Sequence, residues 1–172
     1  MTRSAKIYKI TLAALFIALA LVLPFFTGQI PQIGKMLCPM HIPVLLAGFL
    51  CGPWYGLVVG IISPLLRFVL FGMPTIMPTG IIMSIELASY GFIVGVLYKM
   101  LPRSRSSVYI SLISAMIIGR IIWGIMHVLF FQLGNYEFSW PMFIAGGFTN
   151  SLPGIIAQII LIPLIIFRVE KN

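Results

Sequence analysis

Long apolar runs with almost no charge dominate this chain, and they restrict it to a membrane-spanning fold. Hydrophobic residues make up 60% of the 172 residues and charged residues 8%, whereas a soluble domain carries roughly 25% charged residues. Five runs approach or exceed the ~20 residues that a spanning α-helix needs: 7–26, 54–71, 80–97, 108–131 and 142–167. A sixth run, 41–51, is short for a span. The sequence therefore predicts an all-α, polytopic membrane protein that forms one domain over residues 1–172.

The basic residues predict the topology. They gather at the ends of alternate segments, where membrane proteins keep their cytoplasmic Lys and Arg. The predicted cytoplasmic set is Arg3, Lys6, Lys9, Lys99, Arg103, Arg105, Arg168 and Lys171. We therefore expect six transmembrane helices with both the N and C termini in the cytoplasm. Because the basic residues form neither one face nor one run, no nucleic-acid partner is expected, and no cleavable signal is apparent.

Proline and glycine predict where the segments end. Pro24 is expected to kink or end the first segment, and Gly52-Pro53 marks a tight turn between the second and third. Pro64 suggests a local break inside the third segment. This topology puts Cys38 and Cys51 near opposite surfaces, so a disulfide between them is excluded by distance.

Polar side chains inside apolar segments are the candidate functional residues, because ions in lipid are costly and usually kept for function. With a helical rise of ~1.5 Å per residue, most of them fall at similar heights in the outer half of the membrane. The predicted substrate-binding set is His41, Arg67, Glu86, Tyr90, Arg120, Trp123, His127 and Asn150. We expect them to line a pocket that opens to the outside beneath the loops 27–39 and 72–79.

The sign of this set indicates a ligand class. Arg67 and Arg120 outnumber Glu86, so the set is net positive if all three are ionised. A ligand with a carboxylate or another anionic group would balance that charge. A structural alternative stays open. The presence of Glu86 and either arginine is explained equally well by a salt bridge that holds the helices in register.

The uncharged members also have structural alternatives. His41 follows Met40 at the start of its segment and is also explained as a helix cap. His127 is also explained by hydrogen-bonded packing, Asn150 by a bond across helices, and Trp123 by contact with lipid.

The sequence lacks the patterns of an enzyme. Asp is absent and only three Glu occur, at 86, 137 and 170, so there is no carboxylate dyad. Motifs for a zinc hydrolase, a phosphate loop or a serine nucleophile are missing. We expect no catalytic residue, no metal and no cofactor. One intramembrane acid is also too few for the proton relay of a coupled pump, so energy for uptake would come from a partner.

Two features carry a resemblance to a known family. Ala14-x-x-x-Ala18 is a small-residue motif that allows another helix to approach closely, although packing within the chain explains it equally well. Gly34–Arg67 reads GKMLCPMHIPVLLAGFLCGPWYGLVVGIISPLLR. In these features, its size and its topology, the chain resembles the substrate-binding (S) components of energy-coupling factor (ECF) transporters, the vitamin-uptake systems of bacteria and archaea.

The resemblance implies a six-helix S component in a bacterial or archaeal plasma membrane. It would bind a water-soluble vitamin near the outer face, dock through Ala14 and Ala18 on a transmembrane coupling subunit, and depend on two ATPase subunits that hydrolyse ATP. Pantothenate fits a positive pocket best, and a pyridoxine-type, pyrimidine-type or queuine-like compound comes next. The alternatives from other classes are a stand-alone secondary carrier and a small intramembrane enzyme.

Overall fold

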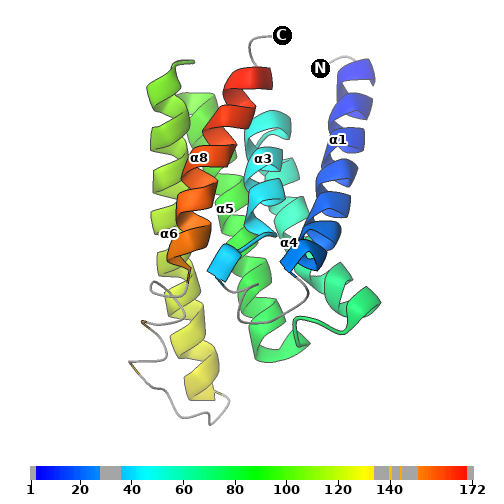
Figure 1. The fold of residues 1–172 in the computed structure, drawn as a ribbon, viewed down its shortest axis with the longest axis vertical. Coiled ribbons are helices and arrows are strands. Elements are labelled where there is room, and N and C mark those ends of the chain that lie inside the picture. Colours follow the sequence, from blue (N-terminus) through cyan, green and yellow to red (C-terminus); the bar gives the residue numbers. More distant parts are fainter. Residues whose placement is uncertain (1–2, 28–35, 134–139, 141–143, 145–150, 170–172) are drawn as a thin grey trace.

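The computed structural model is a bundle of helices that run roughly side by side (Figure 1). It describes residues 3–27, 36–133, 140, 144 and 151–169. The long helices are α1 (Arg3–Val22), α4 (Pro53–Phe71), α5 (Ile81–Met100), α6 (Arg105–Leu133) and α8 (Leu152–Val169), and the short one is α3 (His41–Cys51). Within these described residues, five spans are long and apolar enough to cross a membrane. The prediction of an all-α polytopic membrane protein is confirmed.

Both ends of the described chain lie on one side of the bundle. The start of α1 and the end of α8 are at the same end in Figure 1, as is the turn at Gly52 between α3 and α4. Arg3, Arg105 and Arg168 also fall at this end. The excess of basic residues assigns it to the cytoplasm, and the opposite end, where α3 begins, is the outer end.

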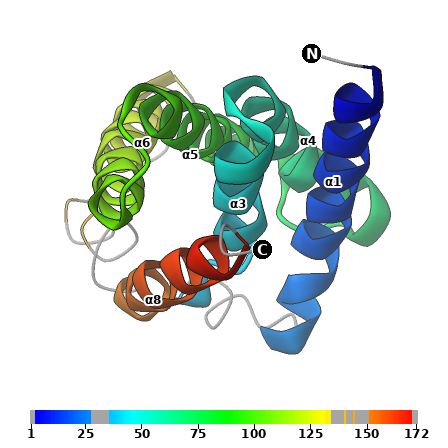
Figure 2. The same ribbon diagram turned by 90° about the horizontal axis from the view of Figure 1, so that it is seen from above.

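The short helix α3 is the centre of the bundle (Figure 2). It packs against α1, α4, α5 and α8, and nine of its eleven residues are buried, from His41 to Cys51. A helix of 11 residues is only about 16 Å long. Because the other helices surround it, α3 can be too short to span the hydrocarbon and still keep its backbone away from lipid.

Glycines allow α4 and α5 to approach closely. A Cβ added at Gly56 of α4 would collide with the backbone carbonyl of Gly91 on α5, and a Cβ at Gly91 would collide with that of Gly56. Such small-residue contacts drive helix association where no hydrophobic effect is available. Gly52 has a different role: its φ of 105° is strained for any residue with a Cβ, and it permits the turn from α3 into α4.

The two proline predictions have different outcomes. The α-helical part of α1 ends at Val22 and continues as the 3₁₀ turn η1 (Leu23–Thr27), which contains Pro24. That prediction is confirmed. The break expected at Pro64 is wrong, since α4 is one continuous helix from Pro53 to Phe71. The contact with α5 accounts for this: Gly60, one turn before Pro64, packs directly on the backbone of Leu87 and Ala88.

Candidate functional site

Glu86 of α5 is the centre of a buried polar cluster. Its Oε1 atom lies 3.2 Å from Arg120 Nη1 and 3.6 Å from His41 Nε2. The hydroxyl of Tyr90 donates a hydrogen bond of 3.2 Å to the same oxygen. Glu86 is only 3% exposed, so these neighbours replace the water that a carboxylate needs. We call His41, Glu86, Tyr90 and Arg120, together with Cys38, the Glu86 cluster.

Three helices, and the segment just before α3 that carries Cys38, bring the cluster together. Glu86 and Tyr90 share one face of α5 because they are four residues apart. His41 is the first residue of α3, at its outer end, and Arg120 comes from α6. Gly119 makes room for this arrangement, since a Cβ there would lie 2.5 Å from the Tyr90 ring. The outer end of α6 projects beyond α3 (Figure 1), which explains why Arg120, deep within its own helix, still reaches Glu86.

Cys38 belongs to the cluster although sequence reasoning did not select it. It is buried and not in a disulfide, and the Arg120 guanidinium is near enough to act on its thiol electrostatically. Burial raises the pKa of the Cys38 thiol to about 11, although the positive charge of Arg120 lowers it in part. The thiol is therefore neutral at physiological pH. The sequence offered one indication of this role, since Cys38 lies only three residues before the predicted site residue His41.

Aromatic side chains on α6 extend the cluster. The Arg120 guanidinium carbon lies 5.7 Å from the centre of the Trp123 ring, within the range of a cation–π contact. The rings of Trp123 and His127 are stacked, with centroids 4.7 Å apart and planes at 27°. The sequence predicted that these three residues share one stripe of α6, and the structure confirms that they are contiguous.

Several nitrogens in the cluster have unused hydrogen-bonding capacity. Both ring nitrogens of His41 and the Nε atom of Arg120 are buried and have no hydrogen-bond partner among the described residues. Buried donors and acceptors without partners are costly. The arrangement can offer these atoms to a polar solute. Among the described residues no group of three His, Cys, Asp or Glu is suited to a metal ion.

Arg67 lies elsewhere, which corrects one prediction. Its Nη1 atom donates a 2.7 Å hydrogen bond to the Leu21 carbonyl of α1, and its guanidinium carbon lies 5.4 Å from the rings of both Phe25 and Phe71. Arg67 forms no ion pair with Glu86. Without it, the Glu86 cluster holds one arginine and one glutamate, so the expected net positive charge is wrong for the residues that are brought together.

The other predicted residues fall into two groups. Asn150 lies outside the described residues. Ala14 and Ala18 are exposed on α1, whereas Ala13, Phe16 and Ala20 face the bundle. Packing within the chain, the alternative explanation for the small-residue motif, is therefore wrong. The motif is part of the surface that remains available to another helix.

The comparisons with known proteins identify the family. The family model described as ECF transporter, substrate-specific component, matches residues 8–166. The chain belongs to this family. No curated protein matches the chain. Membership establishes a substrate-specific subunit of an ECF transporter, a membrane transport component.

Proposed function

We propose that this S component captures a small water-soluble vitamin or related micronutrient from the outer side of the membrane and presents it for ATP-driven uptake by partner subunits. The observation that carries the proposal is the Glu86 cluster near the outer end of α3. An ion pair, an imidazole without a hydrogen bond to the described residues, and an aromatic pair meet in one place inside an S component. Intramembrane ionisable residues of this kind usually mark a solute site.

The charge balance of the cluster changes the expected order of ligands. The expectation of a pantothenate-like carboxylate depends on two arginines facing one acid. Since Arg67 lies against α1, Arg120 is the one arginine among the described residues that pairs with Glu86. A neutral or zwitterionic ligand, able to bond to both ends of the ion pair, suits this balance better than a simple anion.

The aromatic residues favour a planar ligand. Trp123 and His127 present stacked rings beside Arg120, and offset stacking on such rings favours another planar ring. A pyridoxine-type, pyrimidine-type or queuine-like heterocycle therefore becomes the first candidate, and a pantothenate-like carboxylate the second. The proposed contacts are His41, Glu86, Tyr90, Arg120, Trp123 and His127.

The proposed partners are the coupling subunit and two ATPase subunits, with the exposed Ala14 and Ala18 face of α1 as the docking surface. The experiment is reconstitution in liposomes with and without these partners. Uptake of a radiolabelled pyridoxine-type or queuine-like compound should require both the partners and ATP. Uptake by the S component alone, driven by an ion gradient, would support the stand-alone carrier and contradict the proposal.

A further inference from the structure

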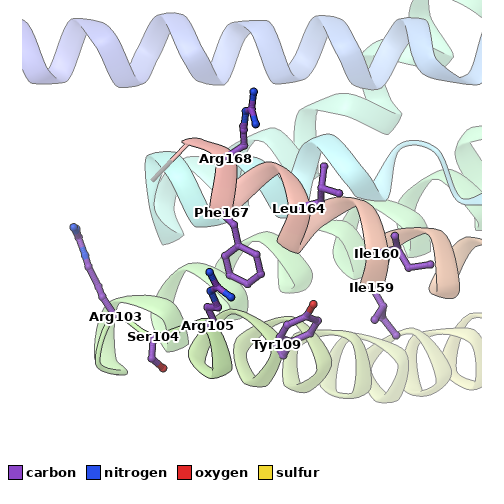
Figure 3. Close-up of a pocket in the computed structure, with 9 residues that line it drawn as sticks. All are labelled: Arg103, Ser104, Arg105, Tyr109, Ile159, Ile160, Leu164, Phe167 and Arg168. Atoms are coloured by element: carbon purple, nitrogen blue, oxygen red, sulfur yellow. The ribbon is translucent and has the colours of Figure 1, made fainter. Parts of the chain in front are cut away.

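An open cavity lies at the cytoplasmic ends of α6 and α8, away from the Glu86 cluster (Figure 3). Its volume is about 950 Å³. The described lining residues are Arg103, Ser104, Arg105, Tyr109, Ile159, Ile160, Leu164, Phe167 and Arg168. Three of these are arginines and none is acidic. The cavity plays no part in the proposed function.

The polar end of the cavity is strongly cationic. Arg105 points from α6 toward α8, and its guanidinium carbon lies 5.7 Å from the Phe167 ring. Arg103 and Arg168 extend outward at the rim (Figure 3). None of the three forms an ion pair or hydrogen bond with another described residue. Within the described part of the chain no acceptor competes for their N–H donors, and the planar guanidinium group matches a phosphate geometrically.

The remainder of the cavity is apolar and exposed. Ile160 and Leu164 of α8 are 59% and 63% exposed, and Ile159 faces α6 (Figure 3). From Arg168 to Ile160 the wall runs about 12 Å along α8, at ~1.5 Å per residue. Half of a ~30 Å hydrocarbon core is about 15 Å. The cavity thus has a cationic end at the membrane surface and an apolar wall roughly as long as one leaflet is deep.

We propose that this cavity binds one anionic phospholipid of the cytoplasmic leaflet. Arg105 would hold the phosphate, Arg103 and Arg168 would add positive charge at the rim, and an acyl chain would lie along Ile159, Ile160 and Leu164. Basic pockets between transmembrane helices on the cytoplasmic side are suited to anionic headgroups. A free phosphate would use only the cationic end and leave the apolar wall without a role.

The test is native mass spectrometry of the whole S component, purified and exchanged into mixed micelles with phosphatidylglycerol or phosphatidylcholine. We expect one phosphatidylglycerol to be retained, and the variant R103Q/R105Q/R168Q to retain it at least tenfold less. The matched control is R3Q/K6Q/K99Q, which removes three exposed charges from the same membrane face outside the cavity. This control should behave like the parent chain.

A second variant keeps the charges and changes the wall. Leu164→Trp should fill the apolar part of the cavity and reduce phosphatidylglycerol retention without altering net charge. Circular dichroism and size-exclusion profiles verify that each variant is folded. Equal loss in the control variant, equal retention of phosphatidylcholine, or displacement of the lipid by millimolar inorganic phosphate would each overturn the proposal. Unchanged retention in Leu164→Trp would also overturn it.

Discussion

Glu86 of α5 and Arg120 of α6 form a buried ion pair, with Oε1 and Nη1 3.2 Å apart. The pair joins two helices that are separate spans of the membrane, and Tyr90 and His41 lie against the same carboxylate oxygen. Removing one member leaves the other as an uncompensated charge, whereas removing both does not. The contribution of the pair to the free energy of unfolding can therefore be measured separately from its contribution to ligand binding.

Glu86→Gln and Arg120→Gln should each destabilise the chain by about 3 kcal/mol, a loss of roughly 6–12 °C in thermal midpoint for a chain of this size. The double variant E86Q/R120Q should lose less than the sum of the two, with a coupling of about 1–3 kcal/mol. Thermal unfolding in detergent followed by circular dichroism measures this. Strictly additive losses would show that the two side chains do not interact.

The reactivity of Cys38 reports on the cluster. Burial raises its pKa from the ordinary 9.0 to about 11, so the neutral thiol persists to higher pH and less thiolate is present at pH 8. In a Cys51→Ala background, alkylation by iodoacetamide at pH 8 should be roughly a hundredfold slower than for an exposed cysteine of ordinary pKa, since each pKa unit changes the thiolate fraction about tenfold.

The pH profile of the alkylation rate supplies the control. In the Cys51→Ala chain the profile should have its inflection near pH 11. Adding Arg120→Gln should move the inflection higher, because the guanidinium charge that lowers the pKa is then absent. An inflection at the ordinary value would mean that Cys38 is not buried beside Arg120.

Arg67 should matter for stability and not for binding. Arg67→Met removes the 2.7 Å hydrogen bond to the Leu21 carbonyl while keeping an apolar side chain between Phe25 and Phe71. Hydrogen bonds from charged groups contribute about 1.5–3 kcal/mol, so we expect a loss of about 2 kcal/mol. The quantity of small-molecule ligand that co-purifies should stay within about twofold of the parent chain when corrected for folded protein. A complete loss of ligand would return Arg67 to the binding site.

Bulky residues on the exposed face of α1 should weaken assembly and leave folding intact. Ala14→Trp/Ala18→Trp places two large side chains on this face, and co-purification with the coupling subunit should fall at least tenfold. The matched control is Ile117→Trp/Ile121→Trp on α6, two positions at the same spacing that are each 56% exposed. Equal losses in the two variants would argue against a dedicated docking face.

The sequence predicted helix ends well where a backbone rule applies. The bounds 41–51 of the second segment match α3 because Gly52 and Pro53 enforce a turn whatever surrounds it. At Pro64 the local rule failed. The neighbouring helix α5 fixes the path of α4, and that contact depends on glycines 30 residues and more apart in sequence, Gly56 and Gly91.

The candidate site was predicted in part, for a geometric reason. Counting residues from the end of a helix gives the height of a side chain but not the direction in which the helix turns it. The predicted convergence succeeded for Glu86, Tyr90 and Arg120. It failed for Arg67, whose side chain faces α1. The misplaced Arg67 then gave the wrong charge for the predicted set and led to the expected preference for a carboxylate.

The most direct measurement is mass spectrometry of the small molecules that stay bound to the S component through gentle purification. It should compare the parent chain with Arg120→Gln and with Arg67→Met. We predict that the parent chain and Arg67→Met carry the same small polar solute, and that Arg120→Gln, while folded, has lost it. If folded Arg120→Gln retained the solute in full, the Glu86 cluster would not be the place where the ligand binds.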